Sequence, residues 1–502
     1  MMCDDFPDNK EEKEDIGNFF VVSNALNRYK KVKNFLGIGF YSLPLQQKKT
    51  QMIALIIIGI LLVGYVLIAT ECFTQVNKAA VAIFACTAGW VLYISYGADF
   101  VMSQHPVEYQ NFLGGAASTS VSVKEFIAGN VFLKYVGRAS EIVLFLLATM
   151  TIVEVLDNNG CFDFISQLLK TRSGKRMLWT LAIVTLLISV NLDNLTTALM
   201  MLVIMRKIIP NRRHRMIYGS AIVVAANCGG AMTVIGDPTG LMLWNNGLVS
   251  ATNYSMSLIV PCLVAWVVPT WWLGRSLPGR VETEWITMPY RGDDTRLNVW
   301  QRLLMLFVGI GGLWFIPTFH TITKLSPFIG ALCVLGVLWI VNEVFNRKLM
   351  NMDAMVRRRM PRALFYGNHQ LILFVMGIIL ALGVVKETGI LTDVWHFLDG
   401  VAPGDWAFGV CAGVISSFLD NFATVASFTS LNPSTEMNAD YWKLIAYGSA
   451  VGSNVLAIGS AAGITLMKTE RIHLGWYFKN VGGMAAIGAA LGFVVLALMI
   501  CA

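Results

Sequence analysis

The chain has 502 residues, of which 56% are hydrophobic and only 14% are charged. A soluble domain carries about 25% charged residues, so this composition excludes an ordinary soluble protein and predicts an all-α polytopic membrane protein. The net charge of +7 is not a nucleic-acid signature, because the basic residues fall between apolar segments, as orientation signals and lipid-facing charges do.

Common catalytic and cofactor motifs are missing from the sequence. The nine Cys include no Cys-x-x-Cys pair and the six His form no His-Glu-x-x-His pattern, which argues against a disulfide framework and a zinc protease. Gly-x-x-x-x-Gly-Lys-[Ser/Thr] does not occur either, so we expect no ATP site. The sequence therefore predicts neither an enzyme nor a bound cofactor.

The first 50 residues differ from the rest of the chain. They begin acidic, turn basic from Arg28 to Lys49, and contain no apolar segment followed by a small-residue cleavage site, as a secretory signal would. We expect residues 1–50 to form an N-terminal extension that lies on the membrane surface.

A membrane-spanning helix needs about 20 mostly apolar residues. Uninterrupted stretches of this kind lie near residues 52–70, 78–98, 139–156, 256–274, 300–318, 324–343, 370–386 and 480–500. Four further apolar stretches are interrupted by polar residues, at 178–207, 216–245, 405–431 and 443–468.

Two of the interrupted stretches contain the same short phrase. Leu192-Asp193-Asn194 lies in the middle of 178–207, and Leu419-Asp420-Asn421 lies in 405–431. An ionisable residue at membrane depth costs roughly 2.5–3.5 kcal/mol on insertion scales and indicates function by default. The alternative is a buried structural hydrogen bond, but the occurrence of the acid in both halves favours a functional role.

The charges that flank these two stretches predict re-entrant hairpins. Lys and Arg bound 178–207 at both ends, whereas Asp and Glu bound 405–431. Because basic flanks face the cytoplasm, each stretch has both ends on one side, the first entering from the cytoplasm and the second from outside. Such a hairpin is allowed where its tip is buried in protein or lines a wet cavity.

The repetition continues beyond the hairpins. Tyr-Gly-Ser-Ala follows each one, at 218–221 and 447–450, and leads to a Gly- and Asn-rich break that frees the backbone groups of a helix. Strict inversion places the N-terminus outside although residues 28–49 are basic. Either a further membrane segment lies before residue 50 or between 100 and 138, or the charge rule does not hold at this end.

We therefore predict two inverted-topology repeats, each with helices, a re-entrant hairpin and a broken helix. The predicted parts are repeat 1 at 51–275 with hairpin 178–207 and broken helix 216–245, a cytoplasmic linker at 276–299, and repeat 2 at 300–502 with hairpin 405–431 and broken helix 443–468.

The hairpin tips and breaks supply carboxylates, amides and hydroxyls, and no Arg or Lys lies in them. Such oxygens suit a hard cation, whereas an anion transporter should offer a positive group or only neutral donors. The candidate cation- and proton-binding residues are Asp193, Asn194, Thr197, Asn227, Asp237, Thr239, Asp420, Asn421, Thr424, Ser453 and Asn454, with Na⁺ expected at Asp193, Asn194, Asp420 and Asn421.

Several polar residues admit two interpretations. Ser189 and Ser416 each precede an Asp by one helical turn, and are either ligands or partners of their own helix backbone. Asp237 precedes Pro238 and is either a ligand or a turn cap. Glu154 either relays protons or ends its helix, because Asp157 and a Gly-containing turn follow it closely.

A buried carboxyl beside another acid can hold a proton near neutral pH and release it when a cation arrives. Competition of H⁺ with Na⁺ or Li⁺ for the same carboxylates is therefore sufficient for exchange. The acids, if close together, would titrate as a coupled set.

Taken together, Ser189–Ala198, Val234–Gly240 and Ser416–Asn421 resemble the NhaD-type sodium/proton antiporters of the ion transporter superfamily. The segment from Glu141 to Glu154 is similar to that family too. The resemblance implies two inverted repeats, a homodimer, and a scaffold beside an elevator-type transport domain. It also implies that Ser460 completes the site with Ser453 and Asn454. The long charged N-terminus and the lack of an acid in the second break depart from the family pattern.

The main hypothesis is thus a Na⁺(Li⁺)/H⁺ antiporter of a bacterial inner membrane, with ions and lipid as its partners and no nucleic acid. The runner-up is a dicarboxylate or arsenite permease of the same superfamily, which should rely on neutral hairpin motifs. An intramembrane aspartyl protease using Asp193 and Asp420 would need a Gly-x-Gly-Asp phrase, which is missing. A passive channel fits closed hairpins poorly.

Overall fold

The computed structural model describes residues 45–162, 164–165, 169, 171, 173–281, 297–346, 369–401, 404–434 and 436–501. Within these ranges every regular element is a helix, apart from one isolated bridge between Ser173 and Arg280. Eight of the described helices are long and apolar enough to cross a membrane. Most of the expected N-terminal extension and of the 276–299 linker lies outside the described residues.

The helices of the first half, up to the linker, are α2 (Leu45–Ala69), α3 (Glu71–Thr74), α4 (Lys78–Ser95), α5 (Gly97–Gln104), α6 (Pro106–Leu113), α7 (Ser120–Phe126), η2 (Ile127–Phe132), α8 (Leu133–Asn158), α10 (Gly174–Ser189), α11 (Asn194–Ile208), α12 (Arg212–Gly230), α13 (Pro238–Asn245) and α14 (Ala251–Arg275).

Those of the second half are α15 (Val299–Leu306), η3 (Phe307–Gly311), α16 (Gly312–Thr323), α17 (Pro327–Asn346), α20 (His369–Glu387), α21 (Ile390–Val401), α22 (Asp405–Phe418), α23 (Asn421–Leu431), α24 (Asp440–Gly452), η4 (Ala457–Gly459), α25 (Ala461–Glu470), α26 (Leu474–Tyr477), η5 (Phe478–Gly482) and α27 (Gly483–Cys501).

One helix differs clearly from its expected bounds. The stretch predicted at 139–156 belongs to a continuous helical segment, Ser120–Asn158, of 39 residues. Lys134, Arg138 and Glu141 interrupt its apolar run, so hydropathy alone does not register its first half. This segment fills much of the 100–138 interval in which a further membrane segment was considered.

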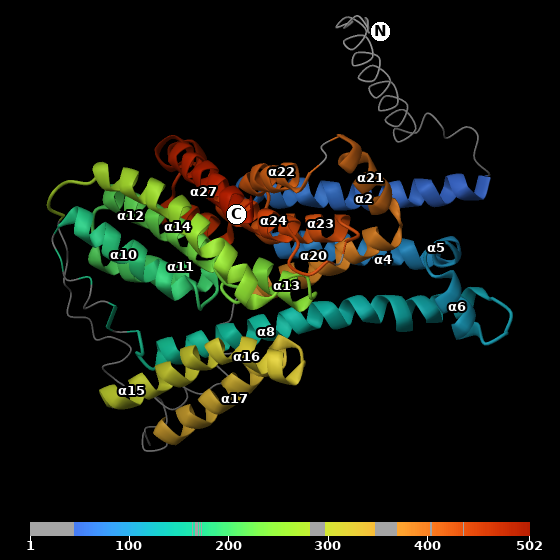
Figure 1. Cartoon of the computed structure of the whole chain (residues 1–502), viewed down its shortest axis with the longest axis horizontal. Coiled ribbons are helices and arrows are strands. Elements are labelled where there is room, and N and C mark those ends of the chain that lie inside the picture. Colours follow the sequence, from blue (N-terminus) through green and yellow to red (C-terminus); the bar gives the residue numbers. More distant parts are fainter. Residues whose placement is uncertain are drawn as a thin grey trace, which may run out of the picture.

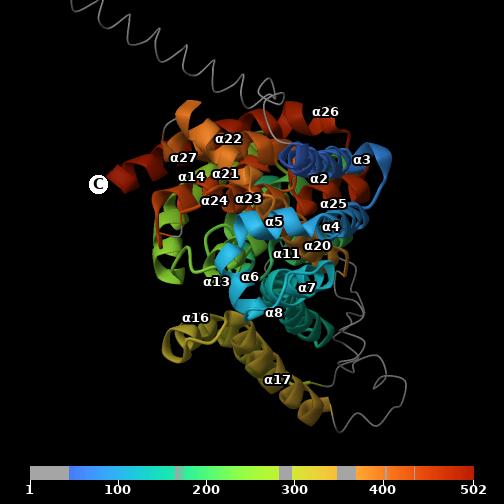
Figure 2. The same ribbon diagram turned by 90° about the vertical axis from the view of Figure 1, so that its right-hand side faces the viewer.

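The helices form two groups. In the flanking group, α4 pairs with α2 and α20, α20 packs on α8, and α17 packs on the other side of α8. In the site group, α10, α11 and α25 pack on α12, α22 and α23 on α24, α13 on α23, and α14 on α27. Figure 1 shows α8 running beneath the site group with α15, α16 and α17 below it, and Figure 2 shows the same layering from the end.

Helices α4 and α20 run in the same direction with close backbones. A Cβ on Gly377 would lie 2.9 Å from Ala82, and one on Gly89 would lie 2.8 Å from Val384. The indole Nε1 of Trp90 donates to the carbonyl of Leu380 at 2.9 Å, which fixes the register of the pair.

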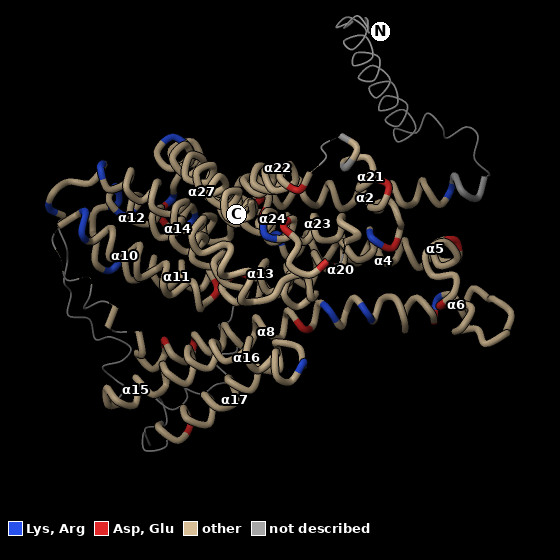
Figure 3. Tube along the Cα trace, in the orientation of Figure 1, with Lys and Arg blue, Asp and Glu red and all other residues tan. Residues whose placement is uncertain are grey.

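Charged residues are sparse along the helices and gather at one end of the site group. Lys and Arg cluster where α10 and α12 begin and where α14 ends, at the left in Figure 3. There Arg206 and Arg215 bind the buried carboxylate of Glu470, at 3.2 and 3.0 Å, and so tie α11 and α12 to α25.

Both Asp-Asn phrases lie between two helices. Helix α10 ends at Ser189 and α11 begins at Asn194; α22 ends at Phe418 and α23 begins at Asn421. A second interruption follows in each half, between α12 and α13 and between α24 and α25. The order of elements around the phrases is therefore the same in both halves.

Glycine allows α22 and α24 to pack at backbone distance. A Cβ on Gly448 would collide with the carbonyl of Gly409, and one on Gly452 would collide with that of Gly413. Because the obstacle is backbone, a rotamer change cannot relieve it. This contact holds α22, which ends at the second Asp-Asn phrase, against α24.

Replacing Gly448 with Ala should therefore destabilise the protein by about 1–3 kcal/mol, the usual cost of overpacking. Thermal unfolding of the purified protein in detergent measures the change. Gly483→Ala is the matched control, because a Cβ there meets nothing within 4 Å. Equal melting temperatures for the two variants would contradict the close-packing argument.

Candidate functional site

The three acids singled out from the sequence are all buried in the site group. Asp193, Asp237 and Asp420 are only 4%, 1% and 5% exposed. Asp237 lies within electrostatic range of the other two carboxylates. The tertiary structure thus gathers acids that are far apart in the sequence into one region.

Each of these acids caps the N-terminus of a helix. Asp193 accepts from the backbone N–H of Thr196 at 3.0 Å, Asp237 from that of Thr239 at 3.0 Å, and Asp420 from that of Phe422 at 3.0 Å. A carboxylate at this position satisfies an unpaired backbone N–H and interacts favourably with the helix dipole. The turn-cap interpretation of Asp237 is therefore correct, but it does not account for all of its contacts.

The second oxygen of Asp237 joins the two halves of the protein. Its Oδ2 accepts from Nδ2 of Asn194 at 3.0 Å and from Nδ2 of Asn421 at 2.9 Å. These are the amides of the two Asp-Asn phrases. One carboxylate oxygen thus binds both phrases and fixes their distance from the first break.

Asn227 makes the corresponding link between the two breaks. Its Nδ2 donates to Oδ1 of Asn454 at 2.9 Å and to Oγ of Ser460 at 2.9 Å, with Oγ of Ser453 at 3.5 Å. Its Oδ1 lies 3.5 Å from Nδ2 of Asn194. Ser460 also caps α25 by accepting from the N–H of Gly463.

Four of the predicted hydroxyls donate to backbone carbonyls, among them Ser453, which donates to Ala450 at 2.7 Å. Ser189 of α10 donates to the carbonyl of Ala226 in α12 at 2.6 Å, and Ser416 of α22 donates to that of Ser449 in α24 at 2.7 Å. Each therefore ties its helix to another helix rather than to its own backbone. Thr424 donates to the carbonyl of Asp420 at 3.0 Å. These hydrogen bonds hold the four side chains against the backbone that surrounds the acids.

Three buried oxygens of the site have no hydrogen-bond partner among the described residues. They are Oδ1 of Asp193 and the hydroxyl oxygens of Thr197 and Thr239. A buried polar atom without a partner carries a desolvation cost of about 1–3 kcal/mol, so it needs an explanation. All three belong to the first half, and all are oxygen donors of the kind that hard cations prefer.

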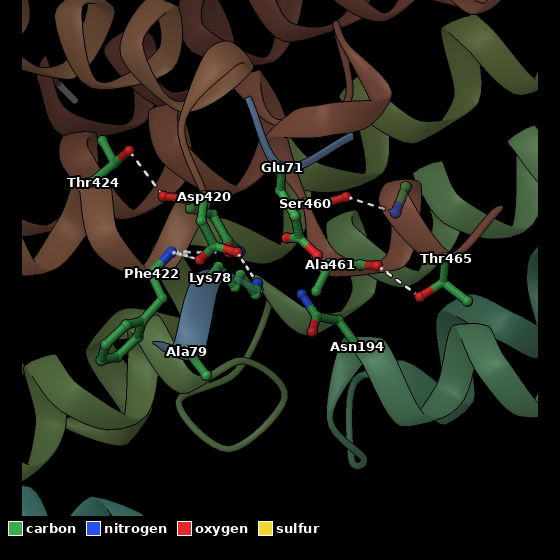
Figure 4. Close-up of polar contacts among 12 residues, drawn as sticks. Glu71, Lys78, Ala79, Asn194, Asp420, Phe422, Thr424, Ser460, Ala461 and Thr465 are labelled. Carbon is green, nitrogen blue, oxygen red and sulfur yellow. Dashed lines mark hydrogen bonds and ion pairs between the residues drawn. The ribbon is translucent and has the colours of Figure 1, made fainter. Parts of the chain in front are cut away.

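Lys78 was missed by sequence reasoning. Its Nζ lies 2.6 Å from Oδ2 of Asp420 (Figure 4). The same Nζ lies 4.4 Å from the ring centre of Phe374. In the sequence it opens an apolar stretch and resembles an interfacial lysine. The tips and breaks lack Lys and Arg, as the sequence shows, but α4 brings a basic group to Asp420 from outside them.

Glu154 lies apart from these contacts. Its Oε1 accepts from Nδ2 of Asn158 at 3.0 Å, one turn later in α8. The contact fits the helix-end interpretation, and the proton relay stays a prediction.

A cavity of about 410 Å³ lies between the flanking and site groups. Residues from α8, α13, α20 and α23 line it, including Glu141, Met242, Lys386 and Ala426. Met242 and Ala426 are about one turn beyond the N-terminal ends of α13 and α23, where Asp237 and Asn421 lie. The cavity therefore lies about one helical turn from the starts of α13 and α23, and its lining residues do not include the three acids.

The chain matches a known transporter family over most of its length. The family model described as "Citrate transporter" matches residues 65–452. "Sodium/proton antiporter 1" of Arabidopsis thaliana is 34% identical over 385 residues, which cover 75% of this chain and 64% of that protein. "Sodium/proton antiporter 2" of the same plant is 30% identical over 437 residues, or 86% of this chain and 96% of that protein.

A bacterial relative carries the name inferred from the motifs. The "Na(+)/H(+) antiporter NhaD" of Vibrio parahaemolyticus is 28% identical over 355 residues, which cover 66% of this chain and 83% of that protein. The family and these relatives are transporters, so the chain is not an enzyme. Together with the eight span-length helices, they make it an integral multi-pass membrane protein. The chain belongs to the citrate-transporter family, and its resemblance to the NhaD-type antiporters is confirmed.

Proposed function

We propose that the protein exchanges Na⁺ or Li⁺ for H⁺ across a membrane, and that the ions compete for the buried carboxylates of Asp193, Asp237 and Asp420. The proposal rests on Oδ1 of Asp193, which has no hydrogen-bond partner in the described ranges, and on the Asp237 carboxylate, which binds both Asp-Asn phrases. The relatives named sodium/proton antiporters support Na⁺ and H⁺ as the exchanged ions.

The chemistry follows from charge and burial. Three carboxylates and one ammonium give the site an excess of negative charge in surroundings with little water. Such an excess is costly unless a cation binds or a carboxyl takes up a proton. Entry of Na⁺ therefore favours loss of H⁺, and the reverse, which is the coupling that exchange requires.

We assign the cation first to the oxygens of the first half. Within the described part of the chain, the site oxygens that are buried without a hydrogen-bond partner are Oδ1 of Asp193 and the hydroxyls of Thr197 and Thr239. Both carboxylate oxygens of Asp420 already accept, from Lys78 and from the N–H of Phe422. Asp420 thus becomes a ligand after a rearrangement, and the first half binds the entering ion.

The proposed architecture is a pair of inverted repeats whose re-entrant hairpins, α10–α11 and α22–α23, meet at their tips. The site group then moves as an elevator against the flanking group, in a homodimer of a bacterial inner membrane. The matching order of elements in the two halves and the cavity between the groups support the first two points. The relatives come from plants as well as bacteria, so the choice of membrane rests on the sequence argument alone.

Anion uptake is the competing function, because the family model carries the name of a citrate transporter. Lys78 is the specific feature in its favour. Its ammonium already binds Asp420, however, and the two other buried acids would repel a carboxylate substrate. The excess of buried acids therefore favours the cation.

Removing the unpartnered carboxylate should abolish exchange. In vesicles with a trapped pH dye, Na⁺ or Li⁺ should collapse an imposed pH gradient for the wild type, and Asp193→Asn should reduce the rate by about 100-fold or more, because a neutral amide cannot exchange a cation for a proton. Asp393→Asn, at an exposed acid of α21, is the matched control and should keep the wild-type rate. Uptake of citrate or succinate without a Na⁺ response would contradict the proposal.

The amide contacts to Asp237 should matter for both stability and exchange. Asn421→Ala removes one of two donors to Oδ2, and a hydrogen bond to a charged group contributes about 1.5–3 kcal/mol. We expect a lower melting temperature and at least a tenfold slower exchange. Asn480→Ala removes an exposed amide that donates to its own helix, and it should change neither quantity. Wild-type exchange in Asn421→Ala would show that the carboxylate does not depend on this donor.

A further inference from the structure

Lys78 lies where the flanking and site groups meet. It is the first residue of α4, which pairs with α2 and α20, whereas its partner Asp420 caps α23. The residue is 9% exposed, and the face of Phe374 on α20 lies beneath its ammonium. Its ion pair therefore joins one helix group to the other at the second Asp-Asn phrase.

Two other polar contacts join the same groups nearby. The hydroxyls of Tyr65 and Ser427 lie 2.7 Å apart, and Nζ of Lys468 lies 2.9 Å from Oε1 of Glu71. Neither contact involves an acid of the site. Of the three contacts, that of Lys78 is the one that links the relative position of the groups to the charge of the site.

The position of Lys78 is unfavourable without Asp420. A positive charge at the N-terminus of a helix meets the positive end of the helix dipole. An ammonium in apolar surroundings also needs a charged partner. The carboxylate of Asp420 supplies that partner. Its Oδ2 accepts a hydrogen bond from the ammonium, which occupies the place that a free cation would take.

We propose that Lys78 is an internal cation that competes with Na⁺ for Asp420, so that binding of Na⁺ breaks the contact between α4 and α23. This inference rests on the proposed function. When Na⁺ neutralises Asp420, the ammonium of Lys78 loses its charged partner, and both the dipole of α4 and the apolar surroundings disfavour it there. The flexible side chain then turns so that the ammonium reaches water. Cation binding thereby releases the site group from α4, and cation release restores the contact. Lys78 acts as a positioning residue and is not a ligand of Na⁺.

The test measures the Na⁺ concentration for half-maximal exchange at one alkaline pH and compares the wild type with three variants. Lys78→Gln removes the competitor, and that concentration should fall about tenfold, since a neighbouring opposite charge changes the affinity of a carboxylate for a cation by at least that factor. Lys78→Arg keeps the charge and should retain a value near that of the wild type. Lys468→Gln also removes an ion pair between the groups, but away from the acids, and should leave the concentration unchanged.

A merely structural role predicts another result. Both Lys78 variants would then lose maximal rate or stability with no fall in the half-maximal Na⁺ concentration, and that outcome overturns the proposal. Failure of wild-type vesicles to respond to Na⁺ would instead contradict the proposed function. The two failures are therefore distinguishable.

A measurement on the wild-type protein covers the case in which Lys78→Gln does not fold. Labelling of Lys78 by an amine-reactive reagent, followed by mass spectrometry, should be faster in NaCl than in choline chloride at equal ionic strength. Labelling of Lys468, whose side chain is 60% exposed, should be the same in both salts. Equal labelling of Lys78 in the two salts would overturn the proposal.

Discussion

Polar groups buried among apolar helices must find partners inside the protein, and the arrangement of the site depends on this constraint. Each interruption of a helix exposes backbone N–H groups that water cannot reach. Asp193, Asp237, Asp420 and Ser460 each accept one of them, and so permit four helices to begin in the interior. The acids that bear the proposed function are therefore also the groups that make the interrupted helices stable.

The same constraint explains why the two halves are held together at the acids. The amides of Asn194 and Asn421 need acceptors, and Asp237 Oδ2 accepts both. Asn227 in turn needs acceptors in the second break and finds them on Asn454 and Ser460. Apolar packing brings the helices close, but these contacts determine which residues face one another.

The two halves of the chain have the same order of helices, but the acids of their Asp-Asn phrases have different charged surroundings. The acid of the second phrase has both oxygens occupied, one of them by Lys78, whereas Asp193 of the first phrase has one oxygen with no partner among the residues that the structure describes. This difference suits the proposed exchange, because Asp193 can bind a cation while the Lys78–Asp420 contact changes as a result. The family name points to an anion, but three buried acids of like charge make an anionic substrate unfavourable here.

The sequence alone determined the class of protein, the helical stretches, the two phrases and most polar residues of the site. These follow from local physics: hydrocarbon excludes charge, so a charge that persists in an apolar stretch stands out. Hydropathy missed the first part of Ser120–Asn158 because Lys134, Arg138 and Glu141 interrupt that run. Flanking charge favoured hairpins, and the structure places a helix on each side of both phrases.

Only the tertiary structure decided which side chains meet. No local pattern indicates that Asp237 binds both Asn194 and Asn421, or that Ser189 and Ser416 bind the backbone of neighbouring helices. Lys78 is the clearest case, since a lysine at the start of an apolar helix has the same sequence signature whether it faces lipid headgroups or a buried acid. Its role depends on the packing of α20 against both α4 and α23, and that packing arises from contacts between residues far apart in the chain.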